Sequence, residues 1–138
     1  MSRIFVDTWA WYALTDTADA DHVLAQLANE QLLDEGHTFV TTNFVLAEAI
    51  TLIRYNLHHS AAVRFWYTLQ ELIEAELVEL VRVDETHEAR AWNIFEHYND
   101  QKFSYTDCTS FAVMQGLNLT HVLTGDHHFA TLGYVLVP

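Results

Sequence analysis

One helix start organises this chain: Ser104-Tyr105-Thr106-Asp107-Cys108-Thr109-Ser110-Phe111-Ala112-Val113-Met114. Ser104 and Asp107 match the S-x-x-D pattern of a capping box, in which a hydroxyl and a carboxylate bind free backbone N–H groups of the first helical turn. The apolar residues that follow predict a buried helix face behind that turn. Asp107 therefore has a structural explanation, and a chemical one depends on the other acids of the chain.

Three further acids stand at comparable places. Asp7 follows the apolar run at residues 4–6, and Asp126 follows the run at residues 122–125. Glu48 lies within a helical pattern among apolar neighbours, where a buried carboxylate needs a partner or a metal. The other interpretation of Glu48, a glutamate at the edge of the apolar stripe that reaches water, stays open. Four acids at such places suggest one metal site.

Short apolar runs alternate with helical patterns along the whole chain. We expect strands at residues 3–6, 37–41, 77–83, 121–124 and 134–137. Helices are expected after Asp7, from a cap at Asp19 or Asp21, from an N-cap at Asn43, from Ser60, after the cap Asp84, after Ser104, and briefly at 127–132. This alternation predicts an α/β fold with a largely parallel sheet, in which the carboxyl ends of the strands form the ligand crevice.

Length and composition favour one globular domain over residues 1–138. Hydrophobic residues make up 51% and charged residues 18%, and one proline with four glycines leaves no linker. We expect no membrane span and no signal peptide, hence a cytoplasmic protein. The single cysteine, Cys108, fits a reducing compartment and is interpreted as a small buried side chain rather than a nucleophile.

The net charge of -13, with only six lysines and arginines, is unusual for a protein that works on nucleic acid. Four carboxylates in a metal site would account for only part of it. The acidity counts mildly against nucleic acid and favours a basic partner or bound cations.

Gathering four acids has an electrostatic cost, because two carboxylates about 5 Å apart repel by about 3 kcal/mol at an effective dielectric near 20. Protons or hard divalent cations must neutralise them, and Mg²⁺ or Mn²⁺ suits an all-oxygen shell. Such a site can activate water for in-line attack on a phosphodiester. The pairs His58-His59 and His127-His128 are poor chelators by spacing, so we interpret them as surface or turn residues.

Four sequence blocks resemble the signature blocks of PIN-domain proteins, and most closely those of the VapC toxins of type II toxin-antitoxin systems. The blocks are Phe5-Val6-Asp7-Thr8, Thr41-Thr42-Asn43-Phe44-Val45-Leu46-Ala47-Glu48, Phe103-Ser104-Tyr105-Thr106-Asp107-Cys108-Thr109-Ser110-Phe111-Ala112 and Thr124-Gly125-Asp126-His127-His128-Phe129. The resemblance runs essentially from end to end. It implies a three-layer α/β/α PIN-like domain.

The resemblance also implies an activity: a Mg²⁺- or Mn²⁺-dependent endoribonuclease that is usually dimeric and is held inactive by a cognate antitoxin with a basic segment. The implied catalytic and metal-binding acids are Asp7, Glu48, Asp107 and Asp126, with Thr8 and Thr106 as supporting hydroxyls. Two positions depart from the pattern. Trp9 stands where small hydroxyl residues are common and would narrow the pocket, and His128 stands where some relatives carry another acid.

Three other protein classes share part of this pattern. A haloacid-dehalogenase phosphohydrolase needs a second aspartate two residues after the first, where this chain has Trp9, and a receiver domain needs a lysine near the end, whereas the only lysine is Lys102. A non-catalytic PIN-like binding or scaffold module remains the alternative, because an acid site can lose activity without losing the fold.

Overall fold

The fold is built around a five-stranded parallel sheet, seen in a computed structural model that describes residues 2–138. The strands are β1 (Arg3–Val6), β2 (Thr38–Thr42), β3 (Val78–Val81), β4 (His121–Leu123) and β5 (Val135–Val137). Their order is β3-β2-β1-β4-β5, and every pair is parallel. Both the five strands and the parallel sheet that the alternating pattern predicts are confirmed.

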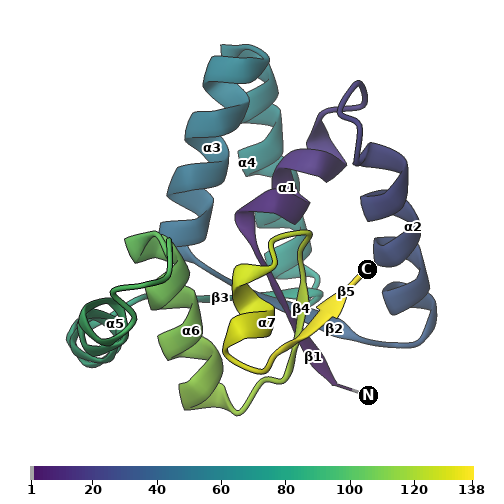
Figure 1. Cartoon of the computed structure of the whole chain (residues 1–138). Helices are drawn as coiled ribbons and strands as arrows, with labels where there is room; N and C mark the ends of the chain where they lie inside the picture. The colour runs from purple at the N-terminus through teal and green to yellow at the C-terminus, as the bar shows by residue number, and fades with distance from the viewer. Residues whose placement is uncertain (1) are drawn as a thin grey trace.

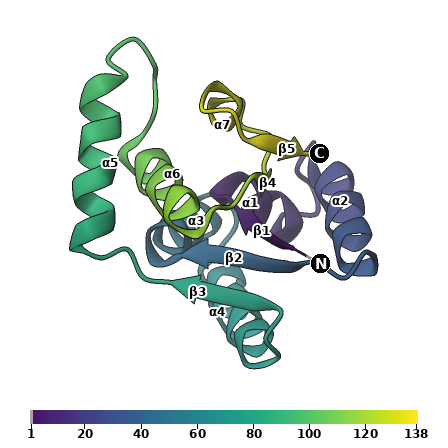
Figure 2. The same cartoon turned by 90° about the horizontal axis from the view of Figure 1, so that it is seen from below.

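Helices connect the strands and cover both faces of the sheet (Figure 1). They are α1 (Thr8–Thr15), α2 (His22–Asp34), α3 (Asn43–Asn56), α4 (His59–Glu74), α5 (Glu85–His97), α6 (Tyr105–Leu117) and α7 (His128–Thr131). Residues of α1, α2 and α4 share an apolar cavity with strand residues Val6 and Phe39. On the opposite face, Phe5 contacts Phe129 of α7, with α6 alongside and α5 outside it (Figure 2). This is the expected three-layer arrangement.

Alternating side chains explain why the central strand can serve both faces. Ile4, Phe5 and Val6 of β1 are all buried, because successive strand residues point to opposite faces and helices cover each of them. Phe5 pairs in register with Val40 on one side and Val122 on the other. The carboxyl end of β1 therefore opens beside the end of β4, which brings Asp7 next to the loop that carries Asp126.

Helix α6 is the most deeply buried helix element of this core. All eight residues from Asp107 to Met114 are buried, so the helix is enclosed rather than buried on one face as the sequence pattern suggests. Phe111 packs against Phe103 and Phe129, each with ring centroids 5.0 Å apart. Small residues such as Ser110 and Ala112 allow neighbours to approach closely on the other sides.

Two helix starts differ from the sequence prediction. Thr42 rather than Asn43 caps α3, because the Thr42 hydroxyl accepts the Val45 amide at 3.1 Å, whereas the Asn43 side chain accepts the Val83 amide at the end of β3. Helix α4 begins at His59 rather than Ser60.

Asp21 stands at the N-cap position of α2 as predicted, but its side chain makes no capping hydrogen bond. His58 caps α4 through its ring nitrogen, which accepts the Ala61 amide. Asp84 caps α5 as expected and forms a capping box with His87. Among residues 2–138 no helix combines the length and apolar character needed to cross a bilayer.

Candidate metal centre

Two strand ends bring Asp7 and Asp126 to one place. Asp7 directly follows β1 and is the N-cap residue of α1, and Thr124, Gly125 and Asp126 follow the neighbouring strand β4. The buried Thr124 hydroxyl donates to Asp7 Oδ2 at 3.0 Å and accepts the Asp126 amide at 3.0 Å. Thr124 thus links the two acids, a role that the sequence analysis missed because hydroxyl residues are common at strand ends.

Asp107 reaches the same place from the first turn of α6. Its Oδ2 accepts the Ser104 amide at 3.0 Å, while its own amide donates to the Ser104 hydroxyl at 3.0 Å. The predicted capping box is therefore confirmed. This box fixes the carboxylate at the mouth of the helix, so the structural and chemical explanations of Asp107 are compatible.

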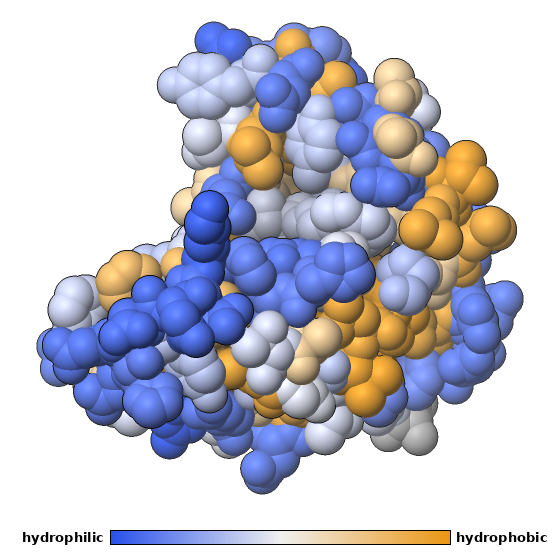
Figure 3. Space-filling model, viewed as in Figure 1, coloured by the Kyte–Doolittle hydropathy of each residue, from blue (hydrophilic) through white to orange (hydrophobic). Residues whose placement is uncertain are grey.

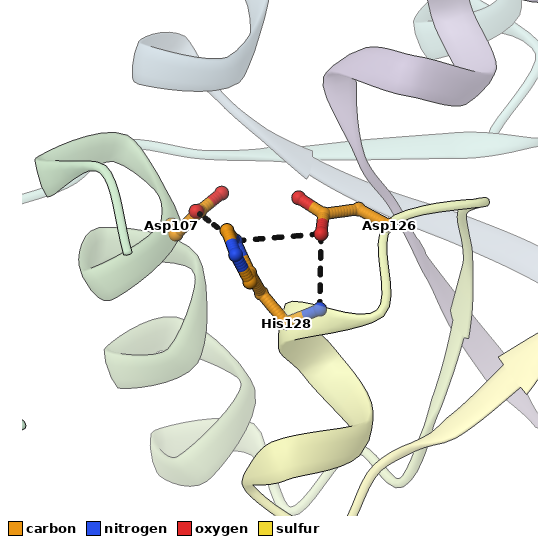
Figure 4. A group of neighbouring side chains, drawn as sticks. All are labelled: Asp107, Asp126 and His128. Carbon is orange, nitrogen blue, oxygen red and sulfur yellow. Dashed lines mark hydrogen bonds and ion pairs between the residues drawn. The ribbon is translucent and has the colours of Figure 1, made fainter. Parts of the chain in front are cut away.

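His128, at the start of α7, lies between Asp107 and Asp126 (Figure 4). Its Nδ1 is 3.2 Å from Asp107 Oδ2 and 3.4 Å from Asp126 Oδ1, and its backbone amide donates to Asp126 Oδ1 at 2.9 Å. His128 is partly exposed, as expected of a surface residue, but its interpretation from sequence did not include these contacts with two acids. His127 is exposed, as expected. One sequence feature could have indicated this contact: Asp126 stands two residues before His128, which is the first residue of the short helix α7.

Burial and like charge perturb the acids of this centre. The pKa of Asp7 is raised to about 7, first by burial and then by the nearby Asp107, and hydrogen bonds from Thr8 and Thr124 offset only part of this. Burial also raises the pKa of Asp107, Asp126 adds to that effect, and contacts from Ser104 and His128 oppose it. A cation would relieve this concentration of negative charge.

Glu48 lies on α3, facing the first turn of α6. It is half-buried and lines a surface hollow together with Thr106, Phe44 and Leu52. Figure 3 shows the surface indented between α3 and α6, with hydrophilic and hydrophobic side chains next to one another around the indentation. The structure thus places Glu48 and Thr106 in a hollow adjoining the acids rather than within hydrogen-bonding contact of them.

Thr8 directly follows Asp7 and is buried. Its hydroxyl has no hydrogen-bond partner among residues 2–138. A buried hydroxyl without a partner is costly, and one beside a carboxylate is available to a ligand or water of the site.

The donor set of the centre fits a divalent cation. Within the described part of the chain, ligand atoms of Asp107, Asp126 and His128 lie within 4.8 Å of one another. Carboxylate oxygens suit Mg²⁺ and Mn²⁺, and crowded, buried acids need positive charge to remain ionised. Asp7 is coupled electrostatically to this group through Asp107 and Asp126.

Trp9 packs against the loop that carries Asp126. A Cβ atom at Gly125 would lie 2.5 Å from Cε2 of the Trp9 indole. We expect Gly125→Ala to lower the free energy of unfolding by about 1–3 kcal/mol, because either the indole or the loop must move. Urea denaturation measures this effect. Gly116→Ala is the control, since its new Cβ would meet no atom closer than 3.6 Å; equal stability of both variants would contradict the prediction.

Cys108 is fully buried next to Asp107. Burial, followed by the charge of Asp107, raises the pKa of its thiol to about 11, so the thiolate is scarce at neutral pH. We expect Cys108→Ser to retain the catalytic activity of this centre within about twofold, although a buried hydroxyl costs about 1–3 kcal/mol of stability. Initial rates and thermal melting measure both effects. Loss of activity in a variant whose melting curve is unchanged would assign a chemical role to the thiol.

The chain belongs to the PIN-domain family, whose model matches residues 4–133. Among individual proteins it is similar to the 23S rRNA-specific endonuclease VapC20 of Mycobacterium tuberculosis H37Rv, with 31% identity over 134 residues and 97% of each chain covered. The resemblance to VapC-type toxins is thereby confirmed.

Solved structures give the same result for the fold. The crystal structure of Mycobacterium tuberculosis VapC20, described as a toxin that cleaves the sarcin-ricin loop, matches with a TM-score of 0.81 and 30% identity over 96% of each chain. VapBC2 of Rickettsia felis bound to promoter DNA matches with a TM-score of 0.70 and 12% identity, covering 99% and 97% of the two chains. FitAcB of Neisseria gonorrhoeae matches with a TM-score of 0.62 and 18% identity, covering 98% of this chain and 96% of that chain.

Proposed function

We propose that residues 1–138 form a single PIN domain that acts as a divalent-metal-dependent endoribonuclease, the toxin component of a type II toxin-antitoxin system. The observation that carries this proposal is the convergence of Asp7, Asp107 and Asp126, with the pKa of Asp7 raised to about 7, in a chain 31% identical to a named endonuclease. Acids with a purely structural role usually lie at the surface, whereas buried acids with raised pKa values are typical of functional sites.

The proposed metal-binding and catalytic acids are Asp7, Glu48, Asp107 and Asp126, with Thr8 and Thr106 in supporting positions. A bound Mg²⁺ or Mn²⁺ supplies Lewis acidity toward water and phosphate oxygens during phosphodiester hydrolysis. The chain's own part is orientation. Thr124 holds the Asp7 carboxylate, Ser104 holds that of Asp107, and the α7 start holds that of Asp126.

The proposed substrate is RNA. VapC20 is named for 23S rRNA, which makes ribosomal RNA the first substrate to test for this chain. We also propose a cytoplasmic location, since ribosomal RNA is found there.

The proposed partners are a cognate antitoxin and a second copy of the chain. A net charge of -13 and an acidic pocket favour an antitoxin segment that carries arginine or lysine. Exposed apolar side chains on α2 and α5, among them Leu27 and Trp92, offer area for such contacts.

Cleavage of purified ribosomal RNA with Mg²⁺, with Mn²⁺ or with excess chelator tests the proposed function. We expect cleavage with at least one of the two cations and no cleavage with excess chelator. Adding the cation back should restore cleavage. Undiminished cleavage in chelator would contradict metal dependence. RNA binding without cleavage under every metal condition would instead support the non-catalytic PIN-like module.

A further inference from the structure

His128 presents a nitrogen donor to the same gap as two proposed metal ligands. Its Nδ1 lies 3.2 Å from Asp107 Oδ2 and 3.4 Å from Asp126 Oδ1. Metal–ligand bonds of about 2.1 Å place neighbouring donors of an octahedral shell about 3 Å apart. The three atoms therefore already stand at nearly the separations that adjacent ligands of one small cation adopt.

The orientation of the imidazole is fixed by contacts outside this group of three. The His128 ring packs edge-on against Phe103, with centroids 5.4 Å apart, and Phe103 packs against the fully buried Phe111 at 5.0 Å. This aromatic wall holds the ring in place beside the acids. In Figure 4 the two carboxylates face each other across the imidazole.

The site is also open to an ion from solution. The His128 side chain is 34% exposed and that of Asp126 is 31% exposed, whereas that of Asp107 is only 12% exposed. A cation can therefore reach Nδ1 and Asp126 from water and complete its shell with Asp107.

We propose that Nδ1 of His128 is a ligand of the bound cation, together with Asp107 and Asp126, and that it makes this site select Mn²⁺ or a similar transition ion over Mg²⁺. The inference rests on the proposed function only in taking the centre to bind a divalent cation. Mg²⁺ prefers an all-oxygen shell, whereas imidazole nitrogen binds transition metals well and neutral imidazole adds no negative charge. His128 is thus a specificity-determining residue.

Mn²⁺ binding, measured without RNA, tests this assignment directly. Pulsed electron paramagnetic resonance of bound Mn²⁺ detects a coordinated nitrogen, and titration calorimetry gives the Kd values for Mn²⁺ and Mg²⁺. The variants are His128→Ala, His128→Gln and His128→Asp, with His127→Ala as a matched control because it removes an adjacent exposed imidazole. Thermal melting establishes which variants are folded. If His128→Ala does not fold, His128→Gln and His128→Asp provide the test instead.

We expect nitrogen coupling in the wild type and in His127→Ala, and none in the His128 variants. Mn²⁺ should bind at least about tenfold more weakly to His128→Ala, and the preference for Mn²⁺ over Mg²⁺ should fall at least about tenfold in His128→Asp, which restores an all-oxygen set. The assignment of His128 is overturned if the wild type binds Mn²⁺ without nitrogen coupling, or if the coupling persists in folded His128 variants. Either result leaves the proposed metal-dependent function untouched. Absence of bound Mn²⁺ overturns the assignment together with the metal-dependent function.

Discussion

Asp107→Asn is expected to lower RNA cleavage by at least about 10³-fold while the protein remains folded. The substitution removes a negative charge from a proposed metal ligand that lies within reach of Asp126 and His128. An asparagine oxygen can still accept the Ser104 amide, so the helix start survives. Initial rates at saturating Mn²⁺, compared with thermal melting of the same samples, measure the effect.

Ser104→Ala separates the capping role from the chemical role. It removes the hydroxyl that accepts the Asp107 amide and leaves the carboxylate in place. The loss of an N-cap hydroxyl costs about 1 kcal/mol of stability, and cleavage should stay within a few fold of wild type. If Ser104→Ala loses as much activity as Asp107→Asn, the carboxylate acts through helix structure rather than through the cation.

Asp7→Asn is expected to raise the metal-free melting temperature at pH 8 by on the order of 10 °C. The folded-state pKa of Asp7 is about 7, against 3.8 as the ordinary value, because the carboxyl is buried near Asp107. Ionising it in the folded chain therefore costs about 4 kcal/mol, an upper figure for a group that is almost fully buried. The amide removes that cost.

The sign of the pH dependence follows from this raised pKa. Below about pH 4 the carboxyl is protonated in both states and costs nothing. Between about pH 4 and pH 7 the unfolded chain releases the proton and the folded chain retains it, so stability falls as pH rises. The difference between Asp7→Asn and the wild type should therefore be small at pH 4, grow through this window and level off above pH 7.

Melting curves of metal-free protein from pH 4 to pH 8 measure this difference. Asp34→Asn, which changes an exposed carboxylate at the end of α2, is the control and should show no such growth. Saturating Mn²⁺ should stabilise the wild type more than Asp7→Asn, because only the wild type keeps the ionised ligand. A constant difference across the pH range would show that the cost does not arise from ionisation of Asp7.

Local patterns were enough to predict the architecture. The alternation of apolar runs and helical segments gave five parallel strands, because strand and helix periods are set by neighbours a few residues apart. The S-x-x-D pattern gave the capping box of Asp107 for the same reason. Acids directly after apolar runs were expected at one sheet edge, and the structure places Asp7 and Asp126 there.

Cap positions show where local patterns were insufficient. Asn43 is a good N-cap residue by type, yet its side chain binds the Val83 amide, 40 residues away. Thr42 then caps α3 instead. The neighbouring strand β3 decided between the two residues, and no local spacing describes that strand's position.

The composition of the candidate metal centre was also decided by contacts between distant parts of the chain. Thr124 binds Asp7 across 117 residues, and His128 meets Asp107 across 21. The sequence by itself determined the PIN fold and the acids that its strand ends and helix starts carry. Only the tertiary structure decided that an imidazole lies between two of those acids and that Glu48 faces an adjoining hollow. The reason is that side-chain contacts between elements depend on how the helices pack and not on spacing along the chain.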